Sequence, residues 1–167
     1  YHGQSAYLMA VEAATGKTKW KVDGTRGVTS YSTPVMVQAP SGPELIVNSS
    51  EGVAGHNPET GARLWFYAEA NSFPVLAPIP NGGLIYLNRG YRSSPYMAIR
   101  AGGRGDIAAS HVVWRQPTSG PYVPSLVHYQ GLIYMATDAG IVSCIDAATG
   151  ARVWQERGPG GYMGSPV

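Results

Sequence analysis

Short apolar runs alternate with turn residues along the whole chain, and no long stretch has the spacing of an amphipathic helix. In the segment 124–157, the runs PSLVHYQ, GLIYMAT, GIVSCID and ARVWQER follow one another, with turn residues at each junction. Runs of about five to seven residues rich in Val, Ile, Tyr and Trp are typical of antiparallel strands. The pattern therefore predicts four short strands in this segment.

Two sequence markers repeat with the same period. Tryptophan occurs at positions 20, 65, 114 and 154, at spacings of 45, 49 and 40 residues. The segments STPV, SFPV, PSLV and GSPV end at Val35, Val75, Val127 and Val167, at spacings of 40, 52 and 40 residues. Four strands in about 45 residues, repeated, are typical of propeller blades. The sequence predicts an all-β fold, a β-propeller of four-stranded antiparallel blades.

The repeat also predicts how the chain is divided. We expect residues 1–167 to form a single propeller segment with an outer hairpin at 4–21, blades at 30–68, 72–116 and 124–157, and the first strand of a further blade at 162–167. The blade at 72–116 carries an insertion at 100–111. Since propellers close with roughly four to eight blades, we expect a segment of a longer propeller, or one completed by another chain. Open blade edges would also allow self-association.

One nine-residue phrase occurs three times, as EAATGKTKW, NPETGARLW and DAATGARVW. We expect it to form the turn between the third and fourth strands, with glycine at positive φ and threonine adding a hydroxyl bond. The final Trp is expected to lie flat against the neighbouring blade and bury on the order of 200 Å². The residues given this structural role are Thr15, Thr60, Thr149, Gly16, Gly61, Gly150, Trp20, Trp65, Trp114 and Trp154.

The phrase extends to Ala-x-acid-x-x-Thr-Gly-x-x-x-Trp, which resembles the tryptophan-docking motif of pyrroloquinoline-quinone-type (PQQ-like) β-propeller repeats. Ala10 begins the first copy, Cys144 replaces alanine in the last, and the copy that begins at Gly55 is looser. A further copy, between Ala98 and Trp114, has six extra residues, with Gly102-Gly103 in place of Thr-Gly. The resemblance covers nearly all of the chain.

The resemblance implies a small set of functions. Its family includes quinoprotein dehydrogenases, an outer-membrane assembly lipoprotein that uses the propeller as a scaffold, and secreted bacterial proteins. We expect a non-catalytic scaffold or binding module, periplasmic or secreted, that holds a protein or small ligand through its channel mouth and blade loops. The alternative is a fragment of a quinoprotein dehydrogenase that binds PQQ and Ca²⁺. No cofactor is predicted, because the dehydrogenases typically carry a vicinal cysteine pair and Cys144 is the only cysteine.

Composition narrows the choice further. Charged residues make up 13% of the chain, the formal net charge is +2, and the basic residues form no stripe, so nucleic-acid binding is not expected. The longest apolar run, from Ala6 to Val11, is too short to span a membrane. The positions of His2, His56, His111 and His128 show no metal-ligand spacing. Scattered histidines of this kind favour a structural interpretation.

Several residues were weighed as functional candidates. Cys144 occupies the small-residue slot of its blade, which favours a buried structural thiol over a nucleophile. GRGDIA at 103–108 formally matches a dinucleotide fingerprint, but it lacks the flanking strand and helix. Tyr31, Tyr122 and Tyr162 precede first strands and could ring the mouth of the channel. Those tyrosines are also the only hint of a glycan- or polymer-binding module.

Overall fold

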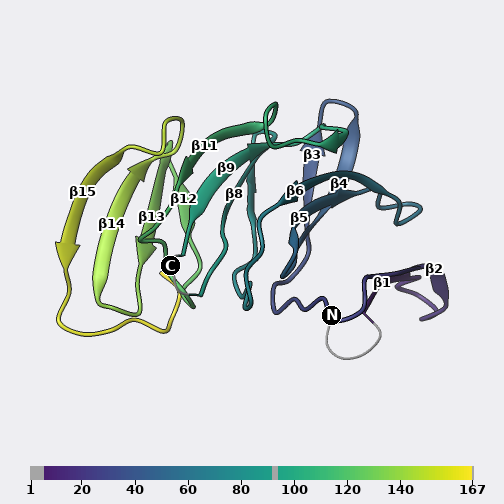
Figure 1. The fold of residues 1–167 in the computed structure, drawn as a ribbon, viewed down its shortest axis with the longest axis horizontal. Coiled ribbons are helices and arrows are strands. Elements are labelled where there is room, and N and C mark those ends of the chain that lie inside the picture. Colours follow the sequence, from purple (N-terminus) through teal and green to yellow (C-terminus); the bar gives the residue numbers. More distant parts are fainter. Residues whose placement is uncertain (1–5, 92–93, 167) are drawn as a thin grey trace.

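The computed structural model describes residues 6–91 and 94–166, and every regular element in these ranges is a β-strand. The strands form four sheets, which stand side by side in an open row (Figure 1). None of the described residues form a helix long and apolar enough to cross a membrane. The structure confirms the predicted fold class.

We number the sheets I to IV in chain order. Sheet I contains β1 (Tyr7–Val11) and β2 (Thr18–Asp23). Sheet II contains β3 (Val35–Ala39), β4 (Gly42–Asn48), β5 (Gly52–His56), β6 (Arg63–Ala68) and β10 (Gly105–Asp106). Sheet III contains β7 (Ile79–Asn81), β8 (Leu84–Asn88), β9 (Tyr96–Arg100) and β11 (Val112–Gln116). Sheet IV contains β12 (Val127–Tyr129), β13 (Leu132–Ala136), β14 (Ile141–Asp146) and β15 (Arg152–Arg157).

Sheets II, III and IV each contain a four-stranded antiparallel meander whose first strand lies at the inner edge. The first strand β7 contacts both β3 and β12, so the inner edges of neighbouring sheets meet as blades do around a propeller axis. The short link that follows each outer strand therefore leads back to the inner strand of the next sheet. These links all emerge on one face of the row, together with the turns between second and third strands.

The core lies between neighbouring sheets because successive residues of a strand point to opposite faces. In β8, Ile85 and Leu87 pack toward sheet II, whereas Tyr86 packs toward sheet IV. In β9, Met97 packs toward sheet II and Ala98 toward sheet IV. A sheet in the middle of the row thus buries both faces, which explains why its strands are nearly uniformly apolar.

The insertion at 100–111 does more than lengthen a hairpin. Its short strand β10 pairs in parallel with β6, placing Gly105 opposite Trp65 and Asp106 opposite Phe66. Sheet II therefore gains a fifth strand that comes from the blade after it. The insertion acts as a strap between two blades, a long-range pairing that the local strand pattern did not indicate.

The chain end also differs from the expectation. No strand forms within residues 158–166, although a first strand was predicted at 162–167; Val167 lies outside the described residues. The Tyr162 N–H donates instead to the carbonyl oxygen of Thr137 at 3.2 Å. A strand needs a neighbour to complete its hydrogen bonds, and no following sheet stands beside this segment in the described structure. At the other end, residues 4–5 of the expected hairpin and His2 lie outside the described residues.

Candidate functional site

The repeated phrase forms the same turn in three sheets. Gly16, Gly61 and Gly150 have φ of 70°, 78° and 72°, a region that favours glycine. Asp146 Oδ1 accepts the N–H of Thr149 at 2.8 Å as well as its hydroxyl at 2.7 Å. These donors lower the pKa of the Asp146 carboxyl, the threonine hydroxyl contributing most.

The other two copies repeat these bonds with small changes. Asn57 Oδ1 accepts the N–H of Thr60 at 3.1 Å. In the first copy the direction of the hydroxyl bond is kept, since Thr15 Oγ1 donates to Glu12 Oε2 at 2.7 Å. An acid or amide followed three residues later by threonine therefore closes each turn locally.

A tryptophan from the preceding sheet covers two of these turns. The Trp20 indole donates to the carbonyl oxygen of Pro58, and the Trp114 indole to that of Ala147, both at 2.9 Å. A Cβ added to Gly61 would lie 2.6 Å from the Trp20 ring, and one added to Gly150 would lie 2.6 Å from the Trp114 ring. Glycine is therefore required both for its φ and for close approach of the ring.

The tryptophans also need a small residue opposite them within their own sheet. Ala10 pairs with Trp20, Gly55 with Trp65, Ala98 with Trp114 and Cys144 with Trp154. A Cβ on Gly55 would overlap the Trp65 ring. The small-residue slot of the sequence pattern thus lies beneath the indole.

Trp154 differs from the others because no turn covers it. Its side chain is 42% exposed, whereas Trp65 is 1% exposed and Trp114 is 9% exposed. All six residues of β15 are exposed. The outer face of sheet IV is therefore open in the described structure.

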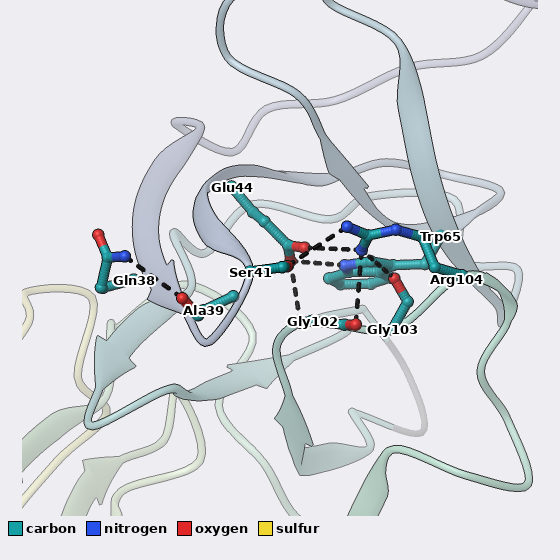
Figure 2. A network of polar contacts seen from close by, with 8 residues as sticks. All are labelled: Gln38, Ala39, Ser41, Glu44, Trp65, Gly102, Gly103 and Arg104. Atoms are coloured by element: carbon teal, nitrogen blue, oxygen red, sulfur yellow. Dashed lines mark hydrogen bonds and ion pairs between the residues drawn. The ribbon is translucent and has the colours of Figure 1, made fainter.

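Trp65 uses a partner that sequence reasoning missed. Its indole donates to Glu44 Oε2 at 2.8 Å, and the same oxygen accepts the N–H of Gly102 at 3.1 Å (Figure 2). Glu44 Oε1 pairs with Arg104 Nη1 at 3.2 Å. Only 1% of the Glu44 side chain is exposed. A buried carboxylate thus ties the insertion to the tryptophan of the sheet before it.

The turn in the third blade is capped by a residue that the sequence pattern contained. Asp106 stands eight residues before Trp114, the spacing that separates Asp146 from Trp154. Its Oδ1 accepts the N–H of Ala108 at 2.9 Å, as Asp146 Oδ1 accepts the N–H of Ala148. The turn of the third blade therefore lies at Asp106, later in the chain than the alignment of Gly102-Gly103 with Thr-Gly placed it, and the Asp106 side chain caps it.

Arg89 fills the space between sheets II and III on the face that carries the links. It is 0% exposed, and its guanidinium donates to the carbonyl oxygens of Ser49, at 2.7 Å, and Glu69 and to the Asn48 side chain. Burial lowers its pKa to about 10. Asn48 in turn donates to the carbonyl oxygen of Leu76 at 3.2 Å, which fastens the link entering sheet III. The sequence feature that could have pointed to this cluster is the asparagine that ends the second strand of two sheets, Asn48 and Asn88.

The tyrosines predicted at the channel mouth are partly brought together. Tyr31, Phe73, Tyr91 and Tyr122 form a continuous series of ring contacts, with centroid separations of 6.0, 5.1 and 5.4 Å. We call these four residues the aromatic row. Tyr31 is 45% exposed and Phe73 is 37% exposed. Tyr162 makes no ring contact with the row among the described residues, and sequence reasoning missed Phe73 and Tyr91.

The remaining candidates lie apart from the aromatic row. Cys144 is a free, fully buried thiol on β14. His56 is buried and its Nδ1 lies 2.9 Å from the Gly61 carbonyl oxygen, whereas His111 and His128 contact Ser110 and Asn81. The GRGDIA segment forms the β10 strap and leads into no helix.

The described residues do not fit the quinone and calcium of the dehydrogenases. Among residues 6–91 and 94–166, no three His, Cys, Asp or Glu side chains gather in a way that could hold a metal ion. Cys144 cannot form a vicinal pair. Trp20 and Trp114 donate to turns of the following sheet, and Trp65 packs in the core between sheets II and III, so none of the three stacks over a central cofactor. No catalytic step is therefore derived through that group.

Comparisons with known proteins give one matching family and several solved structures with a similar fold. A family model described as outer membrane protein assembly factor BamB matches residues 3–156. Comparison with curated proteins gave no match.

Among solved structures, BamB from Moraxella catarrhalis has a TM-score of 0.63 at 16% identity, covering 93% of this chain and 44% of that chain. A europium-containing methanol dehydrogenase has a TM-score of 0.74 at 16% identity, covering 98% and 42%. The computationally designed Ika8 protein has a TM-score of 0.65 at 10% identity, covering 99% and 50%. The chain thus spans half or less of each structure, and the likeness shows the fold alone.

Proposed function

The chain belongs to the PQQ-like repeat family whose model is described as outer membrane protein assembly factor BamB, and from this premise we propose that it is a non-catalytic β-propeller scaffold that holds a protein partner outside the cytoplasm. The partner binds the face that carries the links between blades. By analogy with the family description, the process it serves is the assembly of outer membrane proteins.

The aromatic row is the observation that carries this proposal. Tyrosine and phenylalanine side chains are enriched at protein interfaces, where each buries a large area with few rotatable bonds. Tyr31 and Phe73 expose 45% and 37% of their surface on links that belong to different blades. Hydrogen bonds hold the backbone of both residues: the Tyr31 N–H donates to the carbonyl oxygen of Pro74 at 3.1 Å, and the Phe73 N–H donates to Asn71 Oδ1 at 3.0 Å. A partner therefore meets a surface that is already ordered.

Crosslinking tests this surface with a matched control. A photoreactive phenylalanine analogue is placed either at Phe73, on a link, or at Val113, on β11. Val113 is the control because its exposure of 38% matches the 37% of Phe73. In cells that carry the natural gene, we expect one protein to crosslink from position 73 and not from position 113. The product should decrease when Tyr31→Ser is added. Equal labelling from both positions, or none from position 73, contradicts the proposal.

A second measurement separates the scaffold from the dehydrogenase alternative. The purified chain is titrated with PQQ in the presence of Ca²⁺ while its absorption spectrum and melting temperature are followed. We expect neither to change. A saturable spectral shift, together with a raised melting temperature, would favour the enzyme.

A further inference from the structure

A cavity of about 480 Å³ lies between sheets III and IV, below the link that joins them. Tyr96 of β9 forms one wall, Ser143 of β14 and Arg152 of β15 form the opposite wall, and Tyr91, Tyr122 and Asp138 lie at its link end. The volume is within the range of roughly 300–1,000 Å³ that is typical of small-molecule sites. The cavity is therefore large enough for one compact organic molecule.

The equivalent space between sheets II and III is filled by side chains. There, Arg89 follows the second strand and reaches back to the carbonyl oxygens of Ser49 and Glu69. Thr137 follows the second strand of sheet IV and is much shorter. Met97, paired with Leu87, corresponds in register to Ser143, paired with Met135. Two large side chains are thus replaced by two small hydroxyl-bearing ones, and this replacement opens the cavity.

The cavity wall contains two hydroxyls, on otherwise buried residues, that make no hydrogen bond within the described part of the protein. Ser143 is 4% exposed and Tyr96 is 6% exposed, and neither hydroxyl makes a hydrogen bond with the described residues. Neither hydroxyl oxygen is among the fully enclosed side-chain atoms that lack a partner, so both are accessible from the cavity. A bound molecule with acceptor atoms would satisfy both groups.

The charges around the cavity define the chemistry of that molecule. The Arg152 guanidinium donates through Nη1 to Gln155 Oε1, and its other N–H groups make no hydrogen bond with residues 6–91 and 94–166, so they can bind an anion. Tyr96 and Arg152 line the same cavity, and although burial raises the pKa of Tyr96, the positive charge of Arg152 opposes this rise. A carboxylate placed between them would receive charge-assisted hydrogen bonds.

The link end of the cavity can contact the ring of a sugar whose carboxylate lies near Arg152. The ring centroids of Tyr91 and Tyr122 lie 5.4 Å apart, and the two rings are inclined by 54°. Their apolar faces can contact C–H groups of a ligand. Within the described part of the chain, Asp138 Oδ1 accepts only the long 3.4 Å contact from the Tyr122 N–H, so this carboxylate can accept ligand hydroxyls. We propose that the cavity binds a monomeric sugar acid, with its carboxylate on Arg152 and Ser143 and its ring against Tyr91 and Tyr122.

This site shares Tyr91 and Tyr122 with the aromatic row, but variants at the residues that the two sites do not share can separate the proposals. Tyr31 and Phe73 belong to the aromatic row but do not line the cavity, and Ser143 lines the cavity but is buried away from the row. Ser143→Met, which copies the residue in the filled gap, should abolish ligand binding without affecting the crosslink from position 73. Either proposal can therefore fail while the other stands.

Calorimetry with galacturonate as the probe tests the site. Galactose has the same ring without the carboxylate, and acetate has a carboxylate without the ring. We expect saturable binding of galacturonate, with galactose and acetate at least about tenfold weaker. Arg152→Gln should weaken galacturonate by about tenfold, whereas Arg157→Gln, on the same exposed strand but outside the cavity, should leave it unchanged.

Three outcomes would overturn the assignment. The first is the absence of saturable galacturonate binding to the unaltered chain. The second is equal affinity for galacturonate and acetate, which would remove the role of the tyrosine faces. The third is equal loss in Arg152→Gln and Arg157→Gln, which would reduce the effect to net charge. Circular dichroism of each variant confirms that the fold is retained.

Discussion

The ring of Trp114 lies so close to Gly150 that a single added Cβ atom would come within 2.6 Å of it. The two residues belong to neighbouring sheets and are 36 positions apart in the sequence. The contact therefore joins blades that have no strand pairing with each other. Stacking of this kind is what stabilises repeat architectures, in which a single unit cannot bury its own faces.

Gly150→Ala is expected to destabilise the protein by about 2–4 kcal/mol, because it adds a clash with Trp114 to the cost of a positive φ. Gly16→Ala is the matched control: its φ is 70°, yet nothing lies within 4 Å of the added Cβ. It should cost only about 1 kcal/mol, the conformational part. Urea unfolding followed by tryptophan fluorescence measures both. Equal losses would show that the ring contact contributes nothing.

Truncation of the tryptophans should reveal which of them join blades. Trp114→Ala removes a ring that is 9% exposed and hydrogen-bonded to Ala147, and it should cost about 3–5 kcal/mol. Trp154→Ala removes a ring of the same motif that is 42% exposed, and it should cost less than about 1 kcal/mol in this chain. Thermal melting of both variants checks the difference. A large loss for Trp154→Ala would mean that its ring is covered in solution.

Much of this architecture could be predicted because it depends on local, repeated chemistry. The period of the tryptophans and the glycine of each turn specify strand number, turn position and the direction in which each ring points. The φ values of Gly16, Gly61 and Gly150 follow from a nine-residue phrase alone. Family membership followed from the same residues.

The features that sequence reasoning missed are those where one blade completes another. Glu44 accepts from Gly102 of the next blade, Arg89 donates to Glu69 of the preceding blade, and Phe73 contacts Tyr31 on the preceding link, all at separations that no local pattern encodes. β10 pairs with β6 because the insertion happens to reach the edge of sheet II. The cavity arises from the absence of bulk at Thr137 and Ser143, which becomes visible only when equivalent gaps are compared.

Glu44→Ala is expected to cost about 3–5 kcal/mol, since it leaves the buried Trp65 indole N–H and the partly buried Gly102 N–H without an acceptor. It should also speed hydrogen exchange at Ile107, whose N–H donates to the Phe66 carbonyl oxygen at 3.2 Å in the strap. Glu59→Ala removes another paired glutamate, but one that is 71% exposed, and should change stability by less than about 0.5 kcal/mol. If Ile107 exchange is unchanged in Glu44→Ala, the buried carboxylate does not hold the strap.

Stability should fall on mild acidification because of His56. Burial lowers the pKa of this imidazole below 6.5, chiefly by desolvation, while its hydrogen bond to the Gly61 carbonyl oxygen opposes the shift. Between the lowered pKa of the folded state and 6.5, the unfolded chain binds more protons, so the free energy of unfolding decreases as the pH falls through 6.5 and levels off below the folded pKa. His56→Gln, whose amide can still donate to Gly61, should flatten the decrease between pH 7 and 5.5, whereas His111→Gln should retain it. Urea midpoints measured across this range decide the matter, and an unchanged slope in His56→Gln would assign the acid sensitivity to other groups.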